Sequence, residues 1–273
     1  MKFKYLGTAA FEAVPALFCE CETCKRIRQI GGKSIRTRSQ AIVDNCLLID
    51  FPADTVAHIL SNNIDMSNVR HCLITHNHSD HLYSKDIITL QDGFSHMSDD
   101  YTLTFYATDI AGKNIETEIS SVEKAAFKKV HPFDVVDVGE YSVTVLPAVH
   151  DEKSGPVIYQ INDGAKTILY AHDTHFLHDD VWSYWQQTNP HFDLVSLDCT
   201  NALKPLNYIG HMGLAENIEV RKRMLEMGIV DEKTIFLCNH FSHNGYSVVY
   251  EEFEPIAKKQ GFLTSYDGME FEL

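Results

Sequence analysis

The sequence predicts an α+β fold in which two mixed β-sheets pack face to face and helices cover the outer faces, an αββα sandwich. Short apolar runs rich in β-branched and aromatic residues recur through both halves of the chain. Helical patterns fall between them without the strict strand-helix alternation of a doubly wound parallel sheet. No internal repeat, low-complexity tract or Pro/Gly/Ser-rich linker divides the chain, so we expect one domain over residues 1–273.

The expected strands and helices follow from these two patterns. The strands are Lys2 to Leu6, Ala41 to Ile49, Cys72 to Thr75, Leu103 to Ala107, Ser142 to Leu146, Val157 to Ile161, Thr167 to Ala171, Leu194 to Leu197 and Thr234 to Cys238. The helices are Pro52 to Leu60, Lys85 to Leu90, Asp109 to Ile119, Asp179 to Trp185, Ala215 to Met227 and Tyr250 to Lys259. Gly228 is placed to end the helix before it.

Composition restricts the partners and the compartment. A formal net charge of -15 over 273 residues repels polyanions, so we expect no nucleic acid polymer as a partner. No run approaches the roughly 18 apolar residues that cross a bilayer, and Met1 to Leu6 turns into Gly7-Thr8 too early for a signal peptide. We therefore expect a cytoplasmic protein without membrane contacts, either monomeric or a homodimer.

Three imidazoles and one carboxylate fall within six residues, directly behind an apolar run. The segment is His76-Asn77-His78-Ser79-Asp80-His81. Neutral imidazole and ionised carboxylate are ligands that suit zinc and similar divalent ions. An extended backbone points His76 and His78 to the same side, which leaves Asp80 and His81 to face a second ion. The segment therefore predicts half of a metal centre.

Three further polar residues come directly after apolar runs, where functional side chains often lie. His150 ends the run 143–149, Asp173 comes just after the run 168–171, and His240 follows the run 235–239. Their residue types and positions make these three residues candidates for functional side chains near the first cluster.

Other residues in the same regions leave alternatives open. His172 and His175 flank Asp173, and either of them can join the metal shell on sequence grounds alone. Asp198 closes another apolar run. There it either orients a ligand imidazole or caps the next turn.

A second metal site is indicated near the N-terminus. Cys19, Cys21 and Cys24 place three thiols within six residues, and a reducing cytoplasm favours a thiolate metal site over disulfides. A tetrahedral zinc ion needs a fourth ligand, which His243 can supply three residues beyond His240. We expect one structural zinc here, and we expect it to pin the N-terminal loop to the rim of the first centre.

With these motifs in order, the chain resembles the metallo-β-lactamase superfamily of metal-dependent hydrolases from Met1 to about His243. The resemblance implies the fold of that superfamily and a centre of two zinc or manganese ions that share a hydroxide. It implies that one ion is held by His76, His78 and His150 and the other by Asp80, His81 and His240. Asp173 would bridge the two ions.

The cysteine cluster, together with His240 and His243, is similar to the branch of phosphoribosyl cyclic phosphate phosphodiesterases, the PhnP-like branch. This implies hydrolysis of a small, cyclic or open phosphodiester, the expected small-molecule partner. His211, in Gly210-His211-Met212-Gly213, matches an additional active-site histidine of such phosphodiesterases and would bind phosphate or donate a proton. We expect Asp80, Asp173 and His211 to act in the reaction itself.

Three alternatives belong to the same superfamily. A thioester or lactam hydrolase uses similar metals, and a PqqB-like protein would be a non-catalytic carrier. Di-iron proteins that reduce oxygen or nitric oxide typically carry Glu at the second position of the motif, where this chain keeps His78. All seven expected ligands are present, which favours catalysis over a carrier role.

Overall fold

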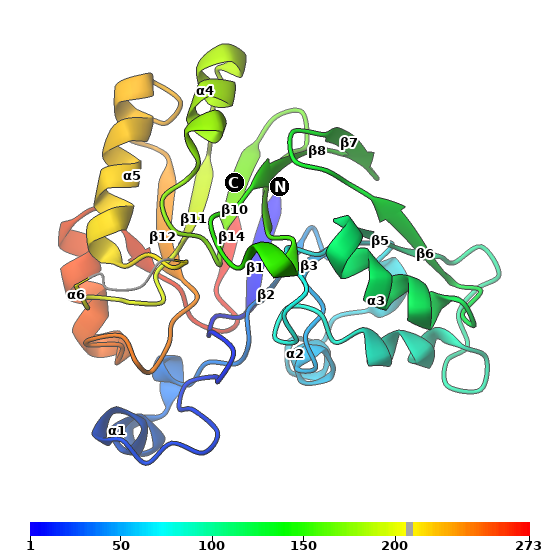
Figure 1. Ribbon diagram of the computed structural model, residues 1–273. Coiled ribbons are helices and arrows are strands. Elements are labelled where there is room, and N and C mark those ends of the chain that lie inside the picture. The colour runs from blue at the N-terminus through cyan, green and yellow to red at the C-terminus, as the bar shows by residue number, and fades with distance from the viewer. Residues whose placement is uncertain (206–209) are drawn as a thin grey trace.

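The computed structural model describes residues 1–205 and 210–273, and in this part of the chain the strands form two seven-stranded mixed sheets (Figure 1). In spatial order the first sheet contains β14 (Glu270–Glu272), β1 (Lys2–Gly7), β2 (Gln40–Val43), β3 (Leu47–Ile49), β4 (His71–Leu73), β5 (Leu103–Ala107) and β6 (Ala125–Lys129). Its pairings are antiparallel from β14 to β3 and parallel from β3 to β6. The N- and C-termini lie side by side because β1 pairs with β14.

The second sheet has a comparable arrangement. In spatial order it contains β13 (Leu263–Thr264), β12 (Ile235–Asn239), β11 (Leu194–Asp198), β10 (Thr167–Ala171), β9 (Val157–Asn162), β8 (Tyr141–Pro147) and β7 (Val135–Val138). Strands β10 to β13 are parallel, whereas β7 to β10 are antiparallel. The carboxyl ends of β10, β11 and β12 therefore meet at one edge of the sheet, which brings together the residues that follow them.

The two sheets pack against each other through a continuous apolar core. It joins Phe3, Tyr5 and Leu47 of the first sheet to Val145 and Tyr170 of the second, all of them fully buried. Strand β10 reads Thr-Ile-Leu-Tyr-Ala and is buried at every position, as expected for a central strand that is covered on both faces.

Helices cover the outer face of each sheet, which confirms the predicted αββα sandwich. The α-helices of the described residues are α1 (Glu22–Ile30), α2 (Thr55–Asn62), α3 (Asp109–Ile119), α4 (Asp179–Thr188), α5 (Leu214–Met227) and α6 (Tyr250–Lys259), of which α1 belongs to the N-terminal loop region below the sheets. Helices α4, α5 and α6 pack on the second sheet through Trp185, Met224 and Phe253, while α3 packs on the first through Ile115. Figure 1 shows α5 and α6 on one side of the strands and α3 on the other. None of the described helices has the length and apolar character needed to cross a membrane.

Several element predictions were wrong in detail. The stretch Ala41 to Ile49 is two strands, β2 and β3, because Asp44 and Asn45 adopt positive φ angles of 47° and 56° and turn the chain. Lys85 to Leu90 lies in a 3-10 helix, Ser84–Leu90, and not in an α-helix. Helix α1 and strands β6, β7, β13 and β14 were not predicted. Gly228 does end α5, with a φ of 71°.

Candidate metal centre

The seven predicted ligands come together where the two sheets meet. The segment 76–81 follows β4 of the first sheet, whereas His150, Asp173 and His240 follow β8, β10 and β12 of the second. The ligand atoms form two groups, and within each group all atoms lie within 4.8 Å of one another. One group is His76, His78 and His150, and the other is Asp80, His81, Asp173 and His240. This division is the one that the family resemblance implies.

Asp173 lies between the two groups. Its Oδ2 is 2.6 Å from His81 Nε2 and 3.1 Å from His240 Nε2. Toward the three-histidine group, His76 Nε2 lies 3.7 Å from Oδ2 and His150 Nε2 lies 3.8 Å from Oδ1. A carboxylate in this position can contact one ion with each oxygen, as a bridging ligand does.

A buried carboxylate orients two of the imidazoles. Asp50 Oδ2 accepts a hydrogen bond of 2.6 Å from His81 Nδ1, and its Oδ1 accepts two bonds of 2.8 Å from the amide and hydroxyl of Thr75. The Thr75 hydroxyl in turn lies 3.1 Å from His76 Nδ1. Since both Nδ1 atoms are engaged here, the Nε2 atoms of His76 and His81 face the centre.

Backbone and hydroxyl groups orient two more imidazoles in the same way. His150 Nδ1 donates to the carbonyl oxygen of Gly210 at 3.1 Å, and His240 Nδ1 lies 2.8 Å from Thr200 Oγ1. Both rings therefore also present Nε2 to the centre. His78 is reversed, because its Nδ1 faces His76 and His150 at 3.0 and 3.3 Å.

Orphaned buried atoms show that divalent cations fit this site. His81 Nε2, His240 Nε2 and Asp173 Oδ2 are buried and form no hydrogen bond of acceptable geometry with the described residues, although Asp173 Oδ2 lies 2.6 and 3.1 Å from the two nitrogens. Such atoms point at a common centre and not at one another, and leaving them without a partner is costly. Burial also lowers the pKa of His76 and His150, which keeps both imidazoles in the neutral form that binds metal.

Three residues of the centre lie in the left-handed region of backbone conformation. Asp50, Asp173 and His240 have φ angles of 68°, 49° and 63°, and each comes at or just after the end of a strand. Asp, Asn and His enter this region more readily than other residues, and such strain is concentrated at functional sites. The sharp turns direct these side chains into the centre.

His211 lies beside the centre and is held by Asp198. Its Nδ1 is 2.9 Å from Asp198 Oδ2 and 3.4 Å from Asp173 Oδ1. Burial lowers the pKa of His211, but the carboxylates of Asp198, Asp173 and Asp80 together outweigh burial and raise the pKa to about 9. Asp198 also accepts hydrogen bonds of 3.0 Å from the amides of Thr200 and Met212, so it orients His211 and caps a turn as well.

The two histidines that flank Asp173 lie outside both ligand groups. His172 is fully buried, with Nε2 2.6 Å from Ser196 Oγ and Nδ1 3.4 Å from Ser39 Oγ. The backbone amide of His175 bonds to the Val149 carbonyl. Neither belongs to a described group of possible metal ligands, so the structure brings only Asp173 of the three into the centre.

An open cavity of about 660 Å³ gives access to the centre. His78, Asp80, Asp173, His211 and His240 line it on one side. Residues 10–12 of the N-terminal loop, Lys204 and residues 242, 244 and 245 also line it, together with Ser79, His150, Thr200 and Asn201. A cavity of this size holds a small molecule.

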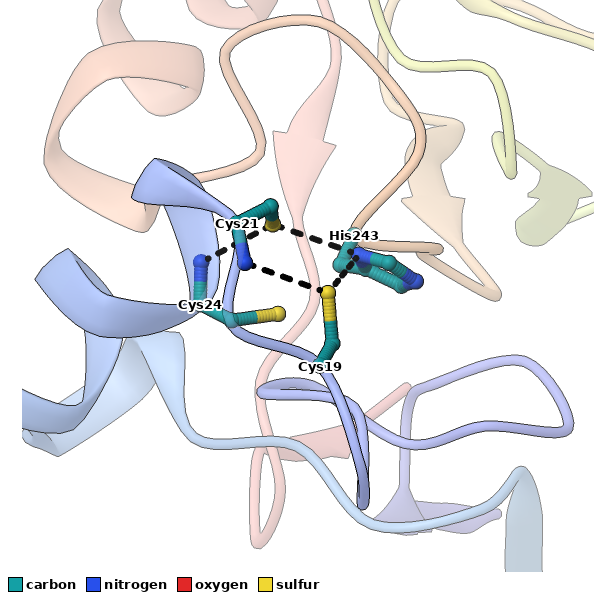
Figure 2. Close-up of side chains that lie close together, drawn as sticks. All are labelled: Cys19, Cys21, Cys24 and His243. Carbon is teal, nitrogen blue, oxygen red and sulfur yellow. Dashed lines mark hydrogen bonds between the residues drawn. The ribbon is translucent and has the colours of Figure 1, made fainter.

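The predicted cysteine site is also assembled (Figure 2). The sulfur atoms of Cys19 and Cys21 each lie 3.6 Å from His243 Nδ1, and Cys24 completes a group whose ligand atoms are all within 4.8 Å. The amides of Cys21 and Cys24 donate to the sulfurs of Cys19 and Cys21 at 3.4 Å. The Cys24 amide and His243 lower the pKa of Cys21 to about 6, which favours the thiolate. This donor set suits a tetrahedral zinc ion.

Asp50 and Thr200, which orient the imidazoles of His81 and His240, were not predicted from the sequence. Asp50 follows the apolar strand β3 just as Asp173 and His240 follow theirs, so its position was the available signal. Thr200, which holds His240, follows Asp198 by two residues and carried no recognisable signal.

Comparisons with known proteins agree with this geometry. A model of the beta-lactamase superfamily domain matches residues 47–228. A crystal structure described as a new diphosphatase from the PhnP family is similar to this chain, with a TM-score of 0.74 and 18% sequence identity. The match covers 100% of this chain and 98% of the chain in that structure. Zinc-bound PqqB from Methylobacterium extorquens has a TM-score of 0.75 at 16% identity, with both chains covered completely.

The short form of human tRNase Z is also similar, with a TM-score of 0.69 and 14% sequence identity. The match covers 100% of this chain and 99% of the tRNase Z chain. At these identities the likeness concerns the fold. No curated protein sequence matches the chain. Since the domain model spans more than half of the chain and the sandwich is that of the family, the chain belongs to the metallo-β-lactamase superfamily of metal-dependent hydrolases.

Proposed function

We propose that this protein hydrolyses a small phosphodiester at a centre of two zinc or manganese ions. The observation that carries the proposal is His211, which lines the cavity next to Asp173 while Asp198 holds its ring. Hydrolysis of a phosphodiester expels an alkoxide that needs a proton, and a protonated imidazole in this place supplies it. The similarity to a structure named as a diphosphatase of the PhnP family supports phosphoryl over acyl substrates.

Different side chains would hold the ions, orient the imidazoles and donate the proton. His76, His78 and His150 would hold one ion, Asp80, His81 and His240 the other, and Asp173 both. Two divalent ions supply a water-derived nucleophile at neutral pH and polarise the phosphoryl oxygens. Asp50 and Thr200 keep the imidazoles aimed at the centre, and His211 delivers its proton to the leaving oxygen.

We also propose a structural zinc on Cys19, Cys21, Cys24 and His243. Burial raises the pKa of Cys24 to about 12, so zinc has to displace the proton of this thiol on binding. The site joins the N-terminal loop to the segment that carries His240, and its role is to stabilise this rim of the cavity.

A substrate panel tests the proposed function. Protein of measured metal content is assayed on bis-p-nitrophenyl phosphate, a ribose cyclic phosphate, S-lactoylglutathione and a cephalosporin. We expect turnover of the phosphodiesters alone, and loss of turnover in Asp173→Ala. The matched control His175→Ala alters a neighbouring residue outside both ligand groups and keeps the activity.

The panel also covers the rival functions. Turnover of the thioester or the lactam without the phosphodiesters contradicts the proposal. The close likeness in fold to PqqB makes a carrier the remaining alternative, and failure of the metal-loaded protein on the entire panel favours it.

A further inference from the structure

Two ligands of different groups lie three residues apart on one segment. His240 belongs with Asp173 in the candidate binuclear centre, while His243 belongs with the cysteines. Ser242, between them, lines the cavity and is buried. The segment 240–243 therefore connects the cysteine site with the wall of the cavity.

Glu12 contacts this segment at two places. Ser242 Oγ donates a short hydrogen bond to Glu12 Oε1, and His243 Nε2 lies 3.7 Å from the same oxygen. On the other side of its ring, His243 Nδ1 faces Cys19 and Cys21. A metal held through Nδ1 leaves the proton on Nε2, and a carboxylate on that side is the usual acceptor for the second nitrogen of a metal-bound imidazole.

Glu12 is itself part of the cavity wall. Its side chain is 28% exposed, and it lines the cavity with Ala10 and Phe11. The backbone around it is fixed independently, because the Ala10 amide donates to the Phe241 carbonyl at 3.0 Å and the Phe241 amide donates to the Thr8 carbonyl at 2.9 Å. Besides the backbone of segment 240–243, the Glu12 side chain is thus a direct contact between His243 and the cavity wall.

We propose that Glu12 is a positioning residue that transmits metal occupancy of the cysteine site to the substrate cavity. Metal on His243 Nδ1 directs the Nε2 proton at Glu12, and Glu12 then holds Ser242 and the following turn in place. Without metal this contact is lost and the wall loosens. The expected effect on substrate binding rests on the proposed function, whereas the effect on the protein itself does not.

Cobalt binding tests the first step. Metal-free wild type, Glu12→Gln and the matched control Glu20→Gln are titrated with Co²⁺, and the thiolate-to-cobalt charge-transfer absorption reports the cysteine site alone. Glu20 is exposed in the same loop. We expect a 10- to 100-fold weaker affinity in Glu12→Gln, the usual loss when the partner of a ligand is removed, and no change in the control.

Hydrogen exchange tests the second step. In an Asp173→Ala background, which removes the shared ligand of the candidate binuclear centre, Co²⁺ binding should slow amide exchange over residues 240–246 in the otherwise unchanged chain and with Glu20→Gln, but not with Glu12→Gln at saturating Co²⁺. Ser242→Ala removes the hydrogen bond to Glu12 together with the one that Ser242 Oγ accepts from the Asn244 amide, so it should keep the Co²⁺ affinity and lose part of this slowing, the Asn244 amide itself being left out of the comparison. With Asp173 intact and bis-p-nitrophenyl phosphate as substrate, we expect a higher KM in Glu12→Gln at unchanged kcat.

The outcomes are decisive. Wild-type affinity in Glu12→Gln overturns the proposal, and so does weakened affinity with full protection of residues 240–246. If the wild type turns over no phosphodiester, the proposed function fails, while the cobalt and exchange measurements still decide the role of Glu12.

Discussion

At the scale of single residues, His211 offers the sharpest test of chemistry. We expect His211→Ala to lower kcat by about 10²- to 10³-fold on an alkyl phosphodiester, because the departing alkoxide loses its proton donor. The loss should be much smaller with p-nitrophenolate, which leaves without a proton. Metal content should stay unchanged, since His211 lies outside the proposed ligand set. Equal losses on both substrates would instead assign His211 to phosphate binding.

Buried His58 gives a prediction on stability. Its Nδ1 is 2.6 Å from Gln40 Oε1 and its Nε2 is 2.7 Å from Thr37 Oγ1, and burial lowers the pKa of His58 to about 4. The unfolded chain binds this proton near pH 6.5, so the contribution of His58 is complete above pH 6.5 and is lost as the pH falls toward 4.

The loss amounts to about 3 kcal/mol. Urea unfolding of the wild type and of His58→Asn between pH 7 and 4 should show a flatter pH dependence in the variant. Parallel curves would refute this assignment. The comparison isolates His58, because the other titrating groups are common to both proteins.

The clustering of the candidate ligands could be predicted from the sequence because their spacing is characteristic. Four of the six residues at 76–81 are candidate metal ligands, and each later candidate follows an apolar run. Asp50 also follows an apolar run but belongs to no motif, and Thr200 has no signal of its own. A single Asp or Thr beyond a strand is common, and only the folded chain places Asp50 against His81 and Thr200 against His240.

At the scale of elements, the strand predictions succeeded where strands are central and failed at the edges. Strand β10 is apolar throughout because both faces are buried. The outermost strands β6 and β7 are partly exposed and include Lys and Asp, so they lack a continuous apolar signal. Helix α1 was missed because its N-cap is Cys21, whose sulfur accepts from the Cys24 amide in place of the usual hydroxyl or carboxylate.

The cysteine site joins helix α1 to the segment 240–243, so we expect metal binding at this site to stabilise the protein. Cys21→Ser should remove about one zinc equivalent per chain and lower the Tm, because zinc binding energy contributes to folding. Cys46→Ser is the control: Cys46 contacts Tyr141 and belongs to no described ligand group, so its replacement should leave the zinc content unchanged. Mass spectrometry of the metals and calorimetry give both readouts, and an unchanged zinc content in Cys21→Ser would contradict the site.

At the scale of the whole molecule, the centre joins the two sheets. The first sheet contributes the segment 76–81, and the second contributes His150, Asp173 and His240. Metal binding therefore favours the packed sandwich over any state in which the sheets separate. At free metal near 1,000 times Kd this linkage is worth about 4 kcal/mol per site, which corresponds to roughly 10 °C in Tm for a chain of this size.

The stabilisation of the protein by metal depends on its net charge and on the salt concentration. The chain carries -15 before any metal binds, and Asp50, Asp80, Asp173 and Asp198 are all buried at or next to the centre. Removing divalent ions with a chelator makes the net charge of the molecule more negative, and salt screens the long-range repulsion between this charge and the exposed acidic groups of the chain. We expect the Tm of the metal-free protein to rise between 10 and 300 mM NaCl, and that of the metal-loaded protein to change much less. Calorimetry of both forms across this range is the measurement. An equal salt dependence would mean that bound metal does not offset the net charge, which would contradict the two divalent ions that we propose.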